Sequence, residues 1–289
     1  MPIVNCQSLS LAYGAVEALK GITFSVGKGE IFGLIGPDGA GKTSLFRILA
    51  TLLLADSGSA SMKGLDVVKD FKKIRRIIGY MPGRFSLYPD LSVEENLTFF
   101  ATIFGTTIRE NYDTIRDIYK QIEPFKTRRA GALSGGMKQK LALSCALIHK
   151  PEILILDEPT TGVDPVSRKE FWDILKTLKS QGITILVSTA YMDEAGLCDR
   201  VALIQQGSIL TIDTPQGITA AYPHRLYAVS SADNYQLLNE LRKNPEVRSA
   251  YIFGEALHVC FSGEPIFPEG VDFNEIAASV EDCFIEKLF

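Results

Sequence analysis

The sequence predicts an α/β fold built around a mostly parallel β-sheet, and three features of the 289-residue chain support this prediction. Short apolar runs alternate with segments of helical spacing, as in parallel strands joined by helices. A glycine-rich loop at 36–43 joins one apolar run to a helix, and Asp157 and Glu158 follow another run. Because ligands of open α/β sheets bind at the carboxyl ends of the strands, we expect both features at one site.

The glycine-rich loop has the P-loop pattern, a glycine followed by four residues and Gly-Lys-Thr. Its backbone N–H groups and the following helix N-terminus are expected to cradle phosphate oxygens. Lys42 is expected to reach the β- and γ-phosphates of a nucleotide, and the Thr43 hydroxyl to hold Mg²⁺. The predicted phosphate-binding residues of the loop and helix start are Gly36, Pro37, Asp38, Gly39, Ala40, Gly41, Lys42, Thr43 and Ser44.

The apolar run 153–156 is typical of a strand that is buried on both faces of a parallel sheet. Two carboxylates follow it directly. Asp157 is placed to hold Mg²⁺, and Glu158 is placed to polarise an attacking water as a general base. Downstream of a P-loop, this arrangement favours a nucleotide-hydrolysing site over an ordinary acidic turn.

The bulk composition excludes several classes of protein. A net charge of −4 argues against a large nucleic-acid surface. The five cysteines form no Cys-x-x-Cys pair, and together with the three histidines they show no metal-ligand spacing, so we expect reduced thiols. The N-terminus lacks the pattern of a signal peptide. No run of about 18 apolar residues occurs, so any membrane role is expected to come through a partner.

The elements before the acidic strand alternate between strand and helix patterns. Ser92 and Glu95 form a capping box that marks a helix start, and the stretch 84–133 is expected to be a mostly helical insert. Periodicity and turn residues predict, in order, short strands within 3–26 with a turn at Tyr13-Gly14, a helix at 44–50, a turn at 55–59, a strand at 77–80, and helices at 93–104, 111–122 and 138–149.

The elements after the acidic strand continue the alternation. Pro165 suits the first position of a helix that runs to about residue 179. A buried strand is predicted at 184–188, and a hairpin is predicted with strands 201–204 and 208–212.

A domain boundary is expected near Asp213-Thr214-Pro215, which divides the chain into 1–220 and 221–289. The second part is predicted to be a small α+β domain of roughly ferredoxin-like order. It carries no nucleotide motif, and we assign it no chemistry. Its predicted elements are a strand at 226–230, a helix at 235–243, strands at 247–253 and 256–261, a loop through 263–265, and a helix at 280–288 capped by Ser279.

Together these motifs resemble those of ABC-type ATPases. The P-loop, Leu133-Ser134-Gly135-Gly136-Met137, the strand 153–158 and Asp164 occur in that family's order. The Leu-Ser-Gly-Gly signature separates the family from other P-loop proteins, so the resemblance over residues 1 to about 220 is specific. It implies a P-loop NTPase fold of ABC type, with an antiparallel N-terminal β subdomain and a helical insert. The C-terminal domain resembles the appendage of ATP-binding subunits of bacterial multidrug-type and polysaccharide-type exporters, related to the daunorubicin-resistance group.

The resemblance also implies a function. It is that of an ATP-hydrolysing, Mg²⁺-dependent subunit held at the cytoplasmic face of the inner membrane by an integral membrane permease, with export as the direction by analogy. The family implies a head-to-tail dimer with a second ABC ATPase subunit, identical or different. Each ATP would lie between one subunit's P-loop and the other's Ser134, Gly135 and Gly136. Tyr13 matches the family's adenine-stacking aromatic, and the insert 84–133 matches the subdomain that docks on the permease.

Two positions depart from the family pattern. The glutamine that helps hold Mg²⁺ and the attacking water is replaced by Gly83, and the histidine that contacts the γ-phosphate is replaced by Ala190. Neither residue has a side chain that can hydrogen-bond. We therefore expect good ATP binding and slow hydrolysis at this chain's own site, while the intact signature loop completes a competent site on a different partner. The opposite expectation, near-normal activity with one of these positions misaligned or altered in cloning, stays open.

Three further alternatives follow from the sequence. The chain could be a nucleotide-gated dimerisation module in which ATP acts as a clamp, which Gly83 and Ala190 favour and Glu158 opposes. An ABC protein acting on DNA or ribosomes is disfavoured by the short insert, the single cassette and the acidic charge. An end at Phe289, just past a closing helix, is compatible with a complete chain and with half of a tandem polypeptide.

Overall fold

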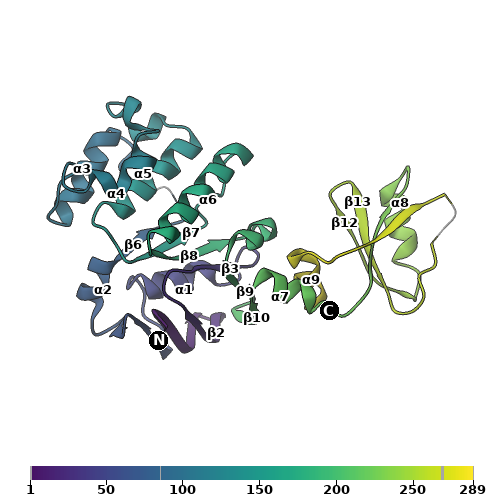
Figure 1. Cartoon of the computed structure of the whole chain (residues 1–289). Coiled ribbons are helices and arrows are strands. Elements are labelled where there is room, and N and C mark those ends of the chain that lie inside the picture. The colour runs from purple at the N-terminus through teal and green to yellow at the C-terminus, as the bar shows by residue number, and fades with distance from the viewer. Residues whose placement is uncertain (1, 85, 268–269, 289) are drawn as a thin grey trace. The chain divides into compact units, whose positions relative to one another are not determined.

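The computed structural model describes residues 2–84, 86–267 and 270–288. The chain forms two compact units, Met1–Pro215 and Gln216–Phe289 (Figure 1). The division falls at the boundary expected near Asp213-Thr214-Pro215, but most of helix α7 (Pro215–Ala220) belongs to the second unit and not to the expected first range 1–220. Ile218 of this helix is buried, and its carbonyl oxygen accepts a hydrogen bond from Cys283 Sγ at 3.4 Å.

A six-stranded sheet forms the centre of the first unit. Three of its four inner strands, β3, β7 and β8, are buried at every residue, which explains their largely apolar sequences. All neighbouring pairs are parallel except β9 and β10, which form the predicted hairpin. In spatial order the strands are β10 (Ser208–Asp213), β9 (Arg200–Gln205), β3 (Ile31–Ile35), β8 (Thr184–Thr189), β7 (Ile153–Asp157) and β6 (Ile78–Met81).

A second, antiparallel sheet from the N-terminal part packs into the same core. Helix α1 (Lys42–Leu49) contributes Leu45, Phe46, Ile48 and Leu49 to this core, together with apolar residues of both sheets. The antiparallel N-terminal sheet predicted by the family resemblance is thus present. Its strands in spatial order are β2 (Val16–Val26), β1 (Val4–Tyr13), β4 (Ser57–Met62) and β5 (Leu65–Asp66).

The insert is mostly helical, as predicted. Ser92 and Glu95 form the expected capping box at the start of α3, because the Ser92 hydroxyl accepts from the Glu95 N–H and the Glu95 carboxylate accepts from the Ser92 N–H. Ser92 and Glu95 therefore fix the residue at which helix α3 begins. Its helical elements are α3 (Val93–Ile103), α4 (Tyr112–Tyr119) and the 3₁₀ turns η1 (Glu123–Phe125) and η2 (Ala130–Ala132).

The remaining helices of the first unit are α2 (Phe71–Ile77), α5 (Gly135–Leu147), α6 (Pro165–Ser180) and the 3₁₀ segment η3 (Met192–Leu197). Helix α5 begins at Gly135, before the predicted start at 138, because Ser134 is its N-cap and accepts from the Met137 N–H. Helix α6 begins at Pro165 as predicted, with Asp164 as its N-cap. Helix α2 was not predicted, since this short basic segment buries only Ile74 and has no clear apolar periodicity.

The second unit is a four-stranded antiparallel sheet with helices. Its strands lie in the order β12-β13-β11-β14. Strand β14 was not predicted, because its residues are mostly exposed and polar. It precedes the last helix, whereas a ferredoxin-like chain order places a helix before the fourth strand. The elements are β11 (Leu226–Ser230), α8 (Asn234–Leu241), β12 (Val247–Phe253), β13 (Ala256–Phe261), β14 (Asp272–Ile276) and α9 (Val280–Glu286).

No helix within the described ranges combines the length and the hydropathy that are needed to cross a membrane.

Candidate functional site

The P-loop connects the buried end of β3 to the start of α1 through a backbone path that only glycine fits at two positions. A Cβ on Gly36 would lie 2.0 Å from the carbonyl oxygen of Ile204, and one on Gly41 would lie 2.4 Å from that of Ala18. Gly41 also has a φ of 103°, which a larger residue rarely adopts. At these two positions the loop backbone therefore packs directly against strands β9 and β2.

Lys42 lies against this loop and is almost fully buried. Its ammonium donates to the carbonyl oxygens of Gly36 at 2.8 Å and Pro37 at 3.0 Å. It also forms an ion pair with Glu158, with 3.1 Å between Nζ and Oε1. The Lys42 ammonium is thus held against the P-loop backbone, and the Glu158 carboxylate balances its charge.

Thr43 and Asp157 meet at the carboxyl end of β7. The Thr43 hydroxyl donates to Asp157 Oδ1 at 3.2 Å, and the Ser188 hydroxyl donates to the same oxygen at 2.6 Å. Hydroxyl and carboxylate oxygens are the ligand types that Mg²⁺ prefers, so this pair fits the ion. Within the part of the chain that the structure describes, no three His, Cys, Asp or Glu side chains gather in a way that would hold a metal alone. An ion here would take its other ligands from phosphate and water.

Glu158 has an uncommon backbone conformation. Its φ is 49°, in the left-handed region, and its N–H donates to the carbonyl and hydroxyl oxygens of Ser188 at 3.1 and 3.0 Å. The Thr161 hydroxyl donates to Glu158 Oε2 at 3.4 Å. These contacts hold the turn that points the Glu158 carboxylate at Lys42. Such conformations cost free energy and are concentrated at functional sites.

One cavity of about 660 Å³ brings together Tyr13, Glu158 and five of the predicted residues of the P-loop and helix start. Tyr13 stands at its rim, half exposed, and its hydroxyl lies 3.3 Å from Ser44 Oγ. Lys20 and Gln206 also line the cavity and were missed, because a lone lysine in a strand and a glutamine in a hairpin turn carry no motif. The lining residues are Tyr13, Ala15, Val16, Glu17, Ala18, Lys20, Gly39, Gly41, Lys42, Thr43, Ser44, Glu158 and Gln206.

The signature residues lie outside this cavity. Ser134 and Gly135 are exposed at the N-terminus of α5. The helix start packs against the loop that precedes α6, where a Cβ on Gly136 would lie 2.8 Å from Ser167 Oγ and one on Gly135 would lie 3.2 Å from the Gly162 carbonyl oxygen. The structure therefore keeps the signature residues apart from the P-loop of the same chain.

The two departures from the family pattern lie beside the site. A Cβ on Gly83 would be 3.1 Å from the Asp157 carbonyl oxygen and 3.7 Å from its Oδ2. Ala190 directly follows β8, whose last carbonyl oxygen, on Thr189, accepts from the Gly36 N–H at 3.2 Å. A side chain at position 83 would thus start next to Asp157. A larger side chain at position 190 would start close to Gly36, the first residue of the P-loop.

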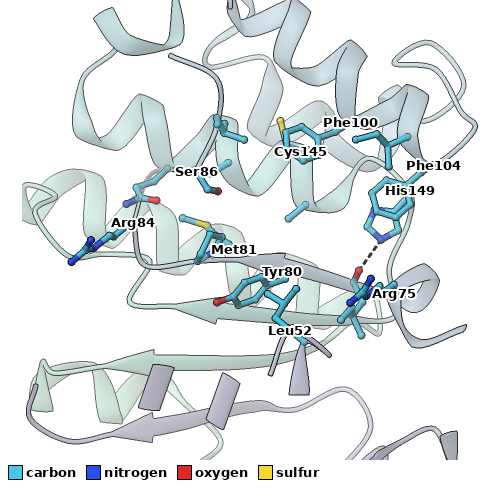
Figure 2. Close-up of a pocket in the computed structure, with 18 residues that line it drawn as sticks. Leu52, Arg75, Tyr80, Met81, Arg84, Ser86, Phe100, Phe104, Cys145 and His149 are labelled. Atoms are coloured by element: carbon cyan, nitrogen blue, oxygen red, sulfur yellow. Dashed lines mark hydrogen bonds between the residues drawn. The ribbon is translucent and has the colours of Figure 1, made fainter. Parts of the chain in front are cut away.

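A second cavity, of about 380 Å³, lies between β6, α3 of the insert and α5 (Figure 2). His149 stacks on Phe104, with 3.7 Å between ring centroids, and its Nε2 lies 2.8 Å from the Ile78 carbonyl oxygen. Burial lowers the pKa of His149, although the hydrogen bond to Ile78 opposes this shift, so the ring is neutral at pH 7. The cavity is mainly apolar, with Arg75 and Arg84 at its edges.

Comparisons with known proteins identify relatives of this chain. The family model described as "ABC transporter" matches residues 19–161. The probable multidrug ABC transporter ATP-binding protein YbhF of Escherichia coli is 39% identical over 284 residues, which cover 94% of this chain and 49% of YbhF. This chain therefore spans about half the length of that relative. The Nod factor export ATP-binding protein I of Burkholderia pseudomallei is 34% identical over 293 residues, which cover 98% of this chain and 95% of that protein.

Solved structures give the same answer for the fold. The structure of CbiO1 from Clostridium perfringens, part of the ABC transporter complex CbiONQ, superposes with a TM-score of 0.68 at 28% identity. The match covers 76% of this chain and 91% of that one. A structure of an ATP-binding subunit of an ABC transporter superposes with a TM-score of 0.69, also at 28% identity, over 76% of this chain and 93% of that one. The P-loop site, the fold and the relatives together establish that this chain belongs to the family of ABC transporter ATP-binding subunits.

Proposed function

We propose that this chain binds and hydrolyses ATP as a subunit of an ABC transporter, and that it dimerises head to tail on ATP to drive an integral membrane permease. The observation that carries the proposal is that Lys42, Thr43 and Glu158 line one cavity together with Tyr13, and that Thr43 contacts the Asp157 carboxylate. Export is the proposed direction, because one relative bears the name Nod factor export protein. The proposed location is the cytoplasmic face of the inner membrane.

The P-loop residues carry the proposed binding role. The loop backbone from Gly36 to Gly41 would surround the phosphates with N–H donors, and Lys42 would add a positive charge. Thr43 and Asp157 would hold Mg²⁺, which neutralises charge on the phosphate oxygens. Tyr13 would stack on the adenine ring, since half of its side chain is exposed at the cavity rim.

Glu158 carries the proposed chemistry. In the arrangement described, its carboxylate is paired with Lys42 and faces the cavity. Phosphate oxygens would compete for the Lys42 ammonium and free the carboxylate. Glu158 could then accept a proton from a water molecule that attacks the γ-phosphorus, as a general base.

Hydrolysis at this site is proposed to be slow, because Gly83 and Ala190 offer no side-chain hydrogen bond. Loss of one donor to a transition state typically lowers the rate by about 10²–10³. Losses of residues that act together are not additive, so the two absences need not multiply. Binding should persist, because Lys42, Thr43 and Asp157 are present.

The exposed signature residues support a second role in a dimer. Ser134 and Gly135 face solvent at a helix N-terminus, which suits contact with the γ-phosphate of a nucleotide bound by the partner subunit. The chain would then complete a partner's site even if its own site is slow. Whether the partner is a second copy or a different ATPase subunit decides whether the dimer has any fast site.

The apolar cavity of Figure 2 is the proposed docking point of the permease. Its walls come from the insert, from α5 and from β6, which leads to Gly83 beside Asp157. Arg75 and Arg84 at its edges favour a cytoplasmic segment of the permease with apolar and acidic residues. Movement of this segment would reach the nucleotide site through the 81–84 turn.

One alternative has specific support. Gly83 and Ala190 also fit a nucleotide-gated binding module, in which ATP closes the dimer and is turned over rarely. Such a chain would pair with a different, active ATPase subunit.

One experiment separates these possibilities. ATP binding, single-turnover hydrolysis and steady-state hydrolysis are measured on the purified chain, with Lys42→Ala and Glu158→Gln as controls. Binding that Lys42→Ala abolishes, with turnover near background, supports the slow site. Turnover of about 1 s⁻¹ or more that both controls abolish would mean that Gly83 and Ala190 are tolerated. Absence of binding would overturn the proposal.

A further inference from the structure

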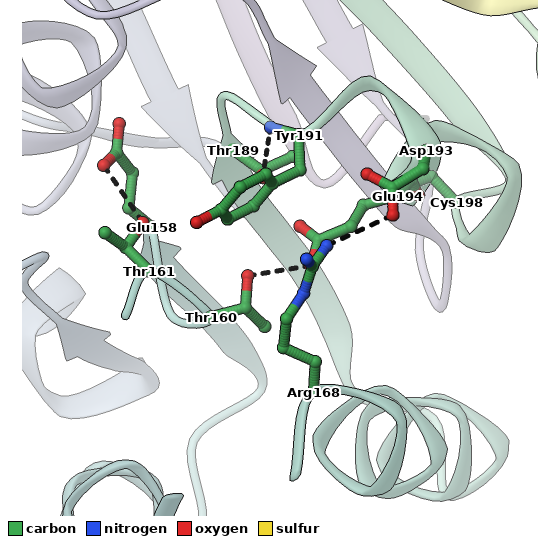
Figure 3. A network of polar contacts seen from close by, with 9 residues as sticks. All are labelled: Glu158, Thr160, Thr161, Arg168, Thr189, Tyr191, Asp193, Glu194 and Cys198. Atoms are coloured by element: carbon green, nitrogen blue, oxygen red, sulfur yellow. Dashed lines mark hydrogen bonds and ion pairs between the residues drawn. The ribbon is translucent and has the colours of Figure 1, made fainter. Parts of the chain in front are cut away.

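A buried ion pair lies behind the loop that carries Glu158 (Figure 3). Glu194, in η3, is almost fully buried, with a side-chain exposure of 2%. Its Oε1 accepts from the Thr160 hydroxyl at 2.8 Å and from Arg168 Nη2 and Nε at 3.1 and 3.3 Å. Three segments therefore meet on one carboxylate oxygen: the loop after β7, the start of α6 and the segment after β8.

Arg168 makes two further contacts with the segment after β8. Its Nη2 donates to Asp193 Oδ2 at 3.3 Å. Its guanidinium lies over the Tyr191 ring, with 4.1 Å between Cζ and the ring centroid. Such stacking orients the planar guanidinium and adds attraction to the ion pair. Tyr191 directly follows Ala190, so Arg168 fixes the backbone next to that position.

The loop side of this cluster leads to the nucleotide cavity. Thr160 contacts Glu194, whereas its neighbour Thr161 donates to the Glu158 carboxylate at 3.4 Å. Glu158 in turn pairs with Lys42. Two sets of polar contacts, joined by the peptide bond between Thr160 and Thr161, thus connect Arg168 in α6 to Lys42 of the P-loop.

Burial makes the ion pair depend on both partners. A carboxylate with little access to water is costly unless a cation and hydrogen bonds compensate it. The second carboxylate oxygen, Oε2, is buried and has no hydrogen-bond partner within the described part of the chain. Arg168 and Thr160 therefore hold Glu194 through its Oε1 atom alone. Loss of either partner is expected to shift the 158–164 loop relative to the 190–194 segment.

We propose that Arg168 is a positioning residue that acts through Glu194 and Thr160. It holds the 158–164 loop, and with it the Glu158 carboxylate, at a fixed distance from the 190–194 segment. The inference rests on the proposed function for the meaning of Glu158, but its structural content can be tested without ATP hydrolysis. This role matters in this chain because the methyl group of Ala190 cannot form a hydrogen bond that would hold the 190–194 segment.

The test compares Arg168→Met with Lys169→Met, an exposed neighbour on the same helix with the same change of charge. A third variant, Arg168→Met with Glu194→Leu, removes both charges so that no unpaired carboxylate stays buried and folding is preserved. Hydrogen–deuterium exchange is read on the 158–164 and 190–194 segments of the full chain. Single-turnover and steady-state ATP hydrolysis give kcat and KM. Arg168→Lys serves as the conservative variant.

The expected result is faster exchange in both segments for Arg168→Met and for the double variant, and wild-type exchange for Lys169→Met. The kcat should fall by about ten- to a hundredfold, the size of effect that misplacement of a reacting group produces. The KM for ATP should stay within about twofold of wild type, and Arg168→Lys should restore part of the kcat because it keeps the charge without the planar fork.

Wild-type exchange in both segments for the double variant would overturn the inference, as would a kcat equal to that of Lys169→Met. If wild-type turnover does not exceed that of Lys42→Ala, the proposed hydrolysis fails instead. The exchange measurement then still decides whether Arg168 holds the two segments together.

Discussion

At the scale of single residues, the ion pair between Lys42 and Glu158 joins the two groups on which the proposed chemistry depends. The distance of 3.1 Å and the near-complete burial of Lys42 mean that each group neutralises the other. A ligand with phosphate oxygens can replace the carboxylate as the partner of Lys42. Binding of the nucleotide is therefore expected to free the Glu158 carboxylate to act as a general base.

Glu158→Gln tests this role directly. The amide keeps the size of the side chain but cannot accept a proton, so we expect hydrolysis to fall by about 10²–10⁴. ATP binding should persist, because the loop and Lys42 are unchanged. The control is Glu152→Gln. Glu152 directly precedes β7, and its exposed side chain pairs with Lys63. Equal turnover in the two variants would contradict the assignment of Glu158.

Ala190→His tests whether Ala190 limits hydrolysis, as the proposed slow site requires. A side chain here starts beside the P-loop, and its imidazole could donate a hydrogen bond to the γ-phosphate, so kcat should rise by about 10²–10³. Gly83→Gln is the less direct variant, because its Cβ would lie only 3.1 Å from the Asp157 carbonyl oxygen. Single-turnover hydrolysis measures both changes. An unchanged kcat for Ala190→His and for the double variant would mean that these positions do not limit the rate.

At the scale of elements, helix α9 is attached to its sheet by a buried carboxylate. Asp282 accepts hydrogen bonds from Ser279 in the capping box and from Tyr251, and its Oδ1 lies 2.6 Å from His258 Nδ1. Burial raises the pKa of Asp282, but the hydrogen bonds from His258, Ser279 and Tyr251 outweigh burial and lower the pKa to about 2. The carboxylate thus ties α9 to strands β12 and β13.

This shift predicts a pH dependence for the second unit. Because the folded pKa lies below the usual value of 3.8, Asp282 stabilises the unit above about pH 4, and this stabilisation is lost as the pH falls towards 2. The difference corresponds to about 2 kcal/mol. Hydrogen exchange of the 247–286 region across a urea series at several pH values measures the effect.

Asp282→Asn should remove that stabilisation at pH 7 and flatten the pH dependence between 4 and 2. The matched control is Asp272→Asn, an exposed aspartate at the start of β14. If both variants unfold at the same urea concentration at pH 7, the buried carboxylate does not hold α9.

At the scale of the whole molecule, the proposed function uses two separate surfaces of the chain. The P-loop cavity lies at the end of the central sheet, whereas Ser134 and Gly135 are exposed outside it. A single chain with both surfaces is suited to head-to-tail pairing, since each surface can meet the opposite one on a partner.

Ser134→Arg tests this pairing. The bulky side chain should block contact with a partner's nucleotide and abolish ATP-dependent dimers of the Glu158→Gln chain, while ATP binding at the P-loop stays within about twofold, as for sites that share no contacts. Gln181→Arg, at the exposed C-cap of α6, is the control. Size-exclusion chromatography with light scattering measures the dimer. Dimers that persist in Ser134→Arg would exclude the proposed interface.

Local sequence patterns predicted much of the fold and of the site. The parallel strands, the capping box at Ser92 and the P-loop depend on residues close together in the chain, and the structure contains each of them. Helix α2 and strand β14 escaped prediction. Their side chains are mostly exposed, so they lack the periodicity that burial imposes.

The sequence alone determined that the chain has a P-loop, an acidic strand end and a signature loop, because each depends on short-range backbone geometry and on residue type. The sequence also predicted that the P-loop and the acidic strand end share one site, but only the tertiary structure decided which side chains pair there. Glu158 pairs with Lys42 and Arg168 pairs with Glu194 across long separations in the chain. Such contacts follow from how the strands pack side by side, and no local pattern encodes that packing. The same packing keeps Ser134 away from the P-loop cavity of its own chain.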